Sequence, residues 1–290
     1  MRRGFDRSQL AWPVAAFLGL GAVLPILMLV LFSVFTVEDF ELIPAFTFAS
    51  WREIATKPTY AILIAKAVGS GLVTALLTAI AGYPVALALA RLPRAWKGVA
   101  LVVLLTPLYT GEIVRIYAWR VVLGNEGLIN AVLQGLRLID SPLKILLFSP
   151  LSTHLVLFYD TLPFMVLALW VSAELVDRAH VEAARDLGAR PWEALLRVIL
   201  PLTAPGLAAG SFAVFALAAG DMLTPSLLGG TSGATAMAMI DSLFGTAFDW
   251  PTASAFALSL LAVLTICAVA LASGVLRLGG RRALVVRAAP

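Results

Sequence analysis

Six long apolar runs set the strongest limit on how this chain folds. Each run has at least the roughly 20 residues that an α-helix needs to cross a bilayer. The runs are residues 10–37, 61–90, 99–123, 151–173, 202–228 and 252–276. Only 13% of the residues are charged, whereas a soluble globular protein has about 25%. Because a helix satisfies its own backbone hydrogen bonds inside lipid, the sequence predicts an all-α membrane protein with six transmembrane helices.

The first run has an alternative interpretation as part of a cleaved signal peptide. A signal peptide has an apolar region of about 7 to 15 residues with a small-residue cleavage site close behind it. Residues 10–37 form a much longer apolar run. We therefore expect an uncleaved first span.

Basic residues fall mainly on one side of the predicted membrane. Six spans place both termini on the same side as the segments after the second and fourth spans. These four segments hold 14 of the 21 Lys and Arg residues: Arg2, Arg3, Arg7, Arg91, Arg94, Lys97, Arg178, Arg185, Arg190, Arg197, Arg277, Arg281, Arg282 and Arg287. Cytoplasmic segments carry such an excess, so both termini are predicted to be cytoplasmic.

Nothing in the sequence predicts a soluble domain or a catalytic site. The segments between spans are too short for an independent core, so residues 1–290 are interpreted as one transmembrane domain. The glycine-rich stretch 227–235 lacks the lysine of a phosphate-binding loop. His154 and His180 fall on opposite faces of the predicted membrane, and Cys267 is the single cysteine. We therefore predict no catalytic residue, no metal site and no cofactor bound by this chain.

The charged segment 174–201 interrupts the apolar pattern between the fourth and fifth spans. Asp177 is placed to cap a helix N-terminus, and Arg185 lies near that helix's last turn, where a cation is favourable. Gly188 suits the end of this helix, and Pro191 suits the first turn of the next. The segment is predicted to form a helix, a tight corner and a second helix that together offer a cytoplasmic docking surface.

Several ionisable residues lie within the predicted spans, where a charge is costly and usually faces the bundle interior. They are Lys66, Glu112, Arg115, Arg120, Asp160 and Asp221. The spacing of Glu112 and Arg115 allows them to pair on one helix face. Asp160 and Asp221 have no basic neighbour at helical spacing, so they are predicted to line a solute path. The alternative is that they cap helices broken at Pro163 or Pro225.

Aromatic residues surround the charged part of the third span. Tyr117 and Trp119 lie near Glu112 in the sequence, and aromatic faces beside a carboxylate bind cations. Such residues more often pack the bundle or form an interfacial belt. Both interpretations are open at this point.

The charged segment also carries a recognisable motif. The stretch EAARDLG (Glu182–Gly188), followed nine residues later by VILP (Val198–Pro201), resembles the EAA signature of membrane permease subunits of binding-protein-dependent ABC importers. Val198 stands where that family often has isoleucine. The stretches YPVALALAR (83–91), VRIYAWRVVLGNEGLIN (114–130), LPFMVLALW (162–170) and TPSLLGG (224–230) are similar to the spermidine/putrescine branch.

This resemblance implies an ABC importer permease (MetI-like) architecture in the bacterial inner membrane. Its implied partners are a second homologous permease, two ATPase subunits that bind the ATP, and a periplasmic solute-binding protein. The implied coupling helix runs over Asp177–Leu187, inside the cytoplasmic loop 174–201. Its implied coupling residues are Glu182, Ala183, Ala184, Asp186 and Gly188. The substrate path proposed above from the residues themselves contains Glu112, Tyr117, Trp119, Asp160 and Asp221.

Three alternatives stay open beside a polyamine permease. The same architecture serves an opine, thiamine, ferric iron or an inorganic anion in related branches. A proton-coupled secondary carrier would use Asp160 or Asp221 as its proton site. The coupling segment could also be an amphipathic helix that contacts only lipid headgroups, although such helices are usually rich in basic residues and large apolar anchors.

Overall fold

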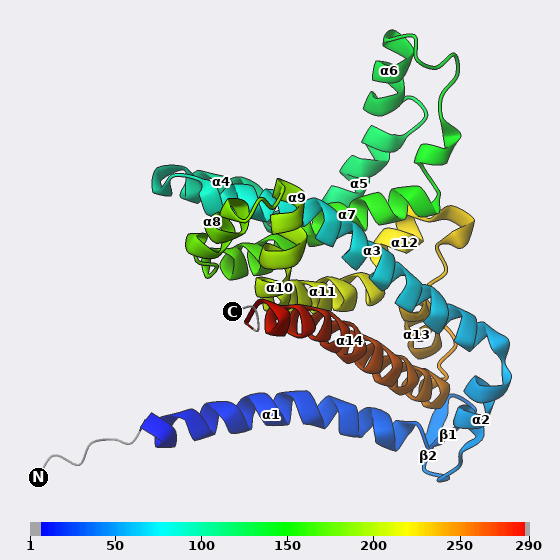
Figure 1. The fold of residues 1–290 in the computed structure, drawn as a ribbon. Helices are drawn as coiled ribbons and strands as arrows, with labels where there is room; N and C mark the ends of the chain where they lie inside the picture. The colour runs from blue at the N-terminus through cyan, green and yellow to red at the C-terminus, as the bar shows by residue number, and fades with distance from the viewer. Residues whose placement is uncertain (1–6, 288–290) are drawn as a thin grey trace, which may run out of the picture. The chain divides into compact units, whose positions relative to one another are not determined.

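The computed structural model describes residues 7–287, and helices make up most of them (Figure 1). In chain order the elements are α1 (Arg7–Phe32), β1 (Thr36–Glu38), β2 (Glu41–Ile43), α2 (Ala49–Thr56), α3 (Pro58–Arg91), α4 (Arg94–Tyr109), α5 (Glu112–Leu123), α6 (Leu128–Gly135), η1 (Lys144–Leu146), α7 (Pro150–Glu174), α8 (Arg178–Asp186), α9 (Pro191–Ala194), η2 (Leu195–Ile199), α10 (Leu200–Leu202), α11 (Ala204–Ala219), α12 (Leu223–Leu228), η3 (Gly230–Ser232), α13 (Ala236–Phe244) and α14 (Trp250–Arg287).

The chain forms two compact units. Within the described part of the chain, the first combines residues 7–64 with Ala236–Ala262, and the second combines Ala65–Thr235 with residues 263–287. The long helices α3 and α14 each contribute residues to both units. Every residue proposed above for coupling or for the solute path belongs to the second unit.

Three helices are long and apolar enough to cross a membrane: Pro58–Arg91, Pro150–Glu174 and Trp250–Arg277. Two helix pairs meet the same criterion together, although each is bent. The first pair is α4 with Glu112–Gly135, bent by 95°, and the second is Pro191–Leu202 with α11, bent by 74°. Within residues 7–287 there are therefore three spanning helices, or five if each bent pair is one span. The apolar helix α1 corresponds to the predicted first span, and the six-span topology stays a prediction.

The predicted third span, residues 99–123, is divided between α4 and α5. Pro107 lies inside the last turns of α4, and Thr110, just after α4, has extended backbone. Proline removes a backbone donor and clashes with the carbonyl four residues earlier, so the helix is weakened where it ends. Gly111 then precedes α5. The chain thus turns sharply next to Glu112 and Arg115.

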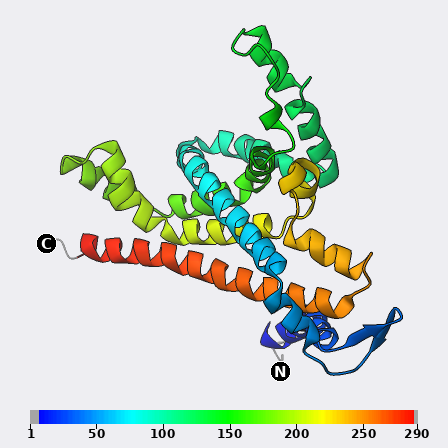
Figure 2. The ribbon, with the colours of Figure 1, turned by 90° about the vertical axis from the view of Figure 1, so that its right-hand side faces the viewer.

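The core of the second unit is built on the close packing of α7 against α11. A Cβ atom added at Gly206 would lie 2.4 Å from the carbonyl oxygen of Ala168 and 2.4 Å from Cβ of Ser172. Small residues of this kind let two helix backbones approach closely in a membrane protein. The buried apolar side chains around this contact include Met165, Val166, Leu169, Val214 and Phe215. In this unit α5 and α6 project away from α7 and α11, as two perpendicular views show (Figures 1 and 2).

The first unit contains a short antiparallel hairpin and an aromatic cluster. In the hairpin Thr36 lies opposite Ile43. The ring of Trp250 contacts Phe32 and Phe244, with ring centres 5.8 and 5.6 Å away. The indole of Trp51 donates a hydrogen bond to the hydroxyl of Ser33 at 3.3 Å.

Candidate functional site

The helix α8 forms where the sequence places specific caps. The carboxylate of Asp177 accepts a hydrogen bond from the backbone N–H of Ala179 at 3.0 Å. Arg185 lies in the last turn of the helix, and Leu187 follows as its C-cap. The predicted helix, Asp177–Leu187, therefore agrees with the structure within one residue at each end.

Gly188 ends α8 in a left-handed conformation, with φ of +84°. Its N–H donates to the carbonyl of Arg185 at 2.8 Å, and the N–H of Ala189 donates to that of Ala184 at 3.0 Å. These two bonds define a Schellman motif, in which glycine adopts positive φ at low cost. The next helix, α9, begins at Pro191 as predicted. The expected tight corner is confirmed.

Most of the expected coupling residues on and next to α8 are exposed to solvent. Glu182, Ala183, Asp186 and Gly188 are exposed, whereas Ala184 is partly buried. Leu187 is 90% exposed, and sequence reasoning did not identify it as a surface residue of the coupling segment. The surface therefore combines small residues, two carboxylates and one exposed apolar side chain.

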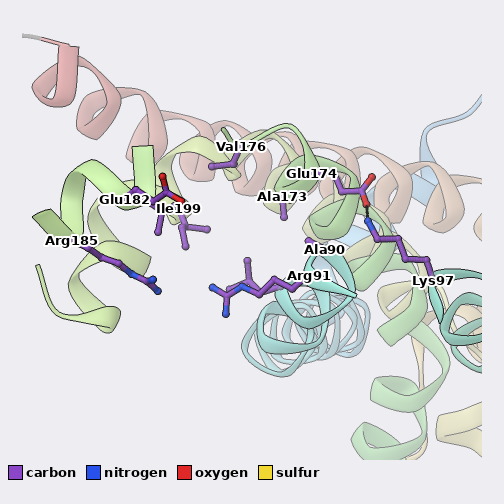
Figure 3. Close-up of a pocket in the computed structure, with 11 residues that line it drawn as sticks. Ala90, Arg91, Lys97, Ala173, Glu174, Val176, Glu182, Arg185 and Ile199 are labelled. Atoms are coloured by element: carbon purple, nitrogen blue, oxygen red, sulfur yellow. Dashed lines mark hydrogen bonds and ion pairs between the residues drawn. The ribbon is translucent and has the colours of Figure 1, made fainter. Parts of the chain in front are cut away.

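A cavity of about 700 Å³ lies beside α8 and is lined by both charged and apolar residues. Figure 3 shows the side chains of Arg185 on α8 and Arg91 at the end of α3 extending toward one another. Lys97 of α4 forms an ion pair with Glu174 at the end of α7, drawn as a dashed line in Figure 3. Sequence reasoning counted Arg91 and Lys97 only as topology signals, since their approach to α8 depends on tertiary structure.

The segment that follows the corner leads from α8 to α11 without an extended linker. It consists of α9, the π-helical turn η2 and α10, and it bends by 74° into α11. Thr203 lies at the bend, and its hydroxyl hydrogen-bonds the hydroxyl of Tyr83 on α3. α8 is thus joined through short helical pieces to α11, which packs against α7.

Four charged residues gather where α5, α7 and the end of α11 approach one another. The Nε atom of Arg115 lies 2.6 Å from Oδ1 of Asp160. Glu112 and Asp221 are both close enough to Asp160 for electrostatic interaction. The ion pair of Arg115 is therefore with Asp160 on α7, whereas Glu112, which could pair with Arg115 by its spacing, interacts with it only electrostatically and at longer range. Asp160 also caps no helix, since α7 continues through Pro163.

Asp221 performs the capping role that was its alternative interpretation. Its Oδ1 accepts from the N–H of Thr224 at 3.0 Å, and its Oδ2 accepts from the hydroxyl of Thr224 at 2.8 Å. Asp221 also lines a cavity of about 270 Å³ together with Lys66, Ser70 and His154. Sequence reasoning missed the proximity of these three residues to Asp221, because they come from α3 and α7 and approach it only in the folded chain.

Tyr117 and Trp119 have different surroundings. The ring of Trp119 contacts that of Tyr159 edge to face, with centres 5.4 Å apart, and it packs against the buried apolar cluster that contains Ile116. Tyr117 is exposed and lies under the guanidinium of Arg120, 5.3 Å from the ring centre. Trp119 thus packs in the bundle, and the face of Tyr117 already contacts a cation of this chain.

Comparison with known proteins gives a consistent result. The family described as "Binding-protein-dependent transport system inner membrane component" matches residues 7–278. The spermidine/putrescine transport system permease protein PotB of Escherichia coli (strain K12) is 33% identical over 252 residues, which cover 87% of this chain and 91% of PotB.

Two solved structures share the fold of this chain. A bacterial ABC transporter that imports the acidic polysaccharide alginate gives a TM-score of 0.65 at 15% identity, with 95% of this chain and 99% of the solved chain covered. A bacterial alginate ABC transporter in complex with a pentasaccharide-bound periplasmic protein gives a TM-score of 0.67 at 13% identity, covering 93% and 96%. At these identities the likeness establishes the fold alone.

Proposed function

This chain belongs to the family of binding-protein-dependent transport system inner membrane components, and we propose that its solute is a polyamine such as spermidine or putrescine. It is a multi-pass permease subunit of an ABC importer in the inner membrane. The proposal names the transported solute, the partner subunits and the residues that take part in transport.

One observation supports a cationic cargo above all others, namely the group of carboxylates in the second unit. Glu112, Asp160 and Asp221 come from separate elements and interact electrostatically. Asp160 lies within the apolar helix α7, and a charge at the centre of a span costs roughly 2.5 to 3.5 kcal/mol on insertion scales. Glu112 is exposed at the start of α5, and Asp221 follows α11. Three carboxylates in this region suit a passing cation. A polyamine offers several ammonium groups on an apolar methylene chain. The 33% identity to a permease named for spermidine and putrescine points the same way.

The proposed importer contains a second homologous permease, two ATPase subunits and a periplasmic solute-binding protein. The ATPases bind and hydrolyse the ATP, and this chain is a non-catalytic subunit without a cofactor of its own. The exposed surface of α8, with Glu182, Ala183, Asp186 and Gly188, is the proposed docking site for one ATPase. Both termini and α8 lie in the cytoplasm in this proposal, as the distribution of basic residues favours.

The proposed mechanism is alternating access driven from α8. Closure of the ATPase pair displaces α8 as a rigid body, because caps stabilise both of its ends. The displacement passes through α9, η2 and α10 to α11, which packs closely on α7. Asp160 lies on α7, so the same motion changes the surroundings of the carboxylates. The solute then moves from an outward-open to an inward-open path.

Uptake of labelled putrescine and spermidine tests the proposed cargo. In the native host, deletion of the gene for this chain is expected to abolish energy-dependent uptake of one or both, and the intact gene is expected to restore it. Vanadate should block this uptake and a protonophore should have little direct effect. Uptake that survives the deletion would remove the polyamine assignment, and inhibition by the protonophore alone would favour a proton-coupled carrier.

A charge reversal on α8 tests the proposed coupling surface. Glu182→Lys is expected to leave the permease inserted but to lower solute-stimulated ATP hydrolysis in the reconstituted complex. Glu126→Lys is the matched control, since Glu126 is also exposed but lies between α5 and α6, far along the chain from α8. Equal ATP hydrolysis in the two variants would contradict the docking role of Glu182.

A further inference from the structure

The ion pair between Arg115 and Asp160 lies inside the second unit and is mostly shielded from solvent. The two side chains are only 14% and 12% exposed, and Nε of Arg115 lies 2.6 Å from Oδ1 of Asp160. Arg115 lies on α5 and Asp160 lies on α7, so the ion pair joins two different helices. Burial at this level makes the pair sensitive to the loss of either partner, because an uncompensated buried charge is strongly destabilising.

Arg115 also contacts the break between α4 and α5. Its Nη1 atom donates to the carbonyl oxygens of Pro107 and Thr110. These carbonyls lie at the end of α4, where the helix leaves its last acceptors without intrahelical partners. The guanidinium therefore has two separable roles, as an N–H donor to the break and as the counter-charge of Asp160.

Among the three carboxylates, Asp160 is the one at which a second cation can replace the cation that pairs with it. Both oxygens of Asp221 accept hydrogen bonds from Thr224. Within residues 7–287, Arg115 is the one ion-pair partner of Asp160. Arg115 is therefore the one charged group that an incoming cation with N–H donors has to displace in order to reach Asp160.

The surrounding charges favour the entry of such a cation. Glu112, Asp160 and Asp221 face two basic groups, Arg115 and the Lys66 that lines the cavity beside Asp221. One negative charge remains in excess. Because a low-dielectric environment strengthens electrostatic interactions, an arriving ammonium group is attracted to this region.

We infer that Arg115 is a tethered competitor of the solute: its guanidinium holds Asp160 in the resting permease, and an ammonium group of the passing cation displaces it. This inference rests on the proposed polyamine function. The exchange replaces one cation by another, so Asp160 stays compensated throughout. A neutral solute cannot make this exchange, which makes Arg115 a specificity-determining residue for cations.

Equilibrium binding of radiolabelled spermidine tests this inference. The full-length chain is purified with the membrane and ATPase subunits that accompany it, reconstituted in nanodiscs, and kept free of the periplasmic binding protein. Arg115→Gln keeps an N–H donor for the helix break and removes the charge. Its Kd for spermidine is expected to fall about tenfold, equivalent to about 1.4 kcal/mol. Asp160→Asn is expected to lose this binding.

Two further variants separate competition from a general charge effect. Arg120→Gln removes a positive charge from the same helix, but Arg120 stacks on Tyr117 and Phe148 instead of pairing with Asp160. It should bind spermidine with the Kd of the wild-type chain. Arg115→Lys keeps the charge without the planar fork that fits a carboxylate, so its Kd should fall by less than that of Arg115→Gln.

The outcomes are distinct. A wild-type or higher Kd for Arg115→Gln overturns the inference, and so does an equal decrease in Arg120→Gln. If Arg115→Gln does not fold, Arg115→Lys decides alone, with a lower Kd in support and an unchanged or higher Kd against. Chain-dependent polyamine uptake in cells, combined with unchanged Kd in the Arg115 variants, overturns the competitor role and leaves the proposed function standing. If cells show no chain-dependent polyamine uptake and the Kd of the Arg115 variants is unchanged, both the competitor role and the proposed function are overturned.

Discussion

Tyr83 and Thr203 hydrogen-bond to one another through their hydroxyl groups, and this contact joins α3 to the bend before α11. Thr203 is 1% exposed, and its own hydroxyl donates to the carbonyl of Ile199 at 2.8 Å. Tyr83 is therefore the donor of the pair. The contact lies in the segment that connects α8 to the α7–α11 core, so we expect it to contribute to stability.

Tyr83→Phe is expected to lower stability by about 1 kcal/mol, the net value of one hydrogen bond. The ring remains, so packing is preserved. The measurement is thermal unfolding of the purified permease complex in nanodiscs. Tyr159→Phe is the control, because within residues 7–287 the Tyr159 side chain has a ring contact with Trp119 but no hydrogen bond of its hydroxyl. Equal destabilisation by the two changes would contradict the role of the Tyr83 hydroxyl.

Gly206→Ala is expected to destabilise the packing of α7 against α11 by about 1 to 3 kcal/mol, as overpacking does in other cores. The added methyl group meets the backbone oxygen of Ala168 at 2.4 Å, and backbone cannot move aside as a flexible side chain does. The amount of folded permease and its melting temperature are the measurements. Gly69→Ala makes the same change in α3, where nothing lies within 4 Å of the new atom, and it should be tolerated.

The coupling segment could be predicted from the sequence because its structure is specified locally. Asp177 caps the helix two residues away, and Gly188 closes a motif that involves only its near neighbours. Such interactions depend on sequence spacing, which a single chain displays. The helical conformation of the apolar runs was predictable for the same reason, since each helix satisfies its own backbone hydrogen bonds.

The charged site could be predicted only in part. Glu112, Asp160 and Asp221 were identified because charges in spans are rare, but the partner of Asp160 was not. Arg115 reaches Asp160 because the chain bends by 95° between α4 and α5. Arg115 also donates to two carbonyl oxygens at the end of α4, and the spacing of residues along the sequence does not predict either contact. Lys66 and His154 join Asp221 only through tertiary packing.

Gly188→Val is expected to reduce coupling, whereas Gly188→Asn is expected to retain most of it. The left-handed conformation at φ +84° costs a residue with a Cβ about 1 to 2 kcal/mol, and a β-branched residue fits it worst. Asn adopts this conformation more readily. Side-chain size does not decide the outcome, because nothing lies within 4 Å of an added Cβ. Solute-stimulated ATP hydrolysis in the reconstituted complex is the measurement, and equal activity of the two variants would refute the requirement for this backbone conformation.

Asp221→Asn is expected to lower polyamine uptake about tenfold, corresponding to about 1.4 kcal/mol, because it removes a negative charge from the proposed solute path. The change also removes the acceptor for the hydroxyl of Thr224 and so weakens the cap of α12. Thr224→Val provides the matched control, since it breaks the same hydrogen bond, keeps the charge of Asp221 and retains the backbone N–H donor.

The two variants separate the charge of Asp221 from its capping role. If the charge matters, uptake of labelled spermidine falls in Asp221→Asn and stays close to wild type in Thr224→Val, while both proteins lose a similar, small amount of thermal stability. Normal uptake in Asp221→Asn would return Asp221 to a purely capping role. Equal loss of uptake in the two variants would show that the integrity of α12, and not the carboxylate charge, is what transport requires.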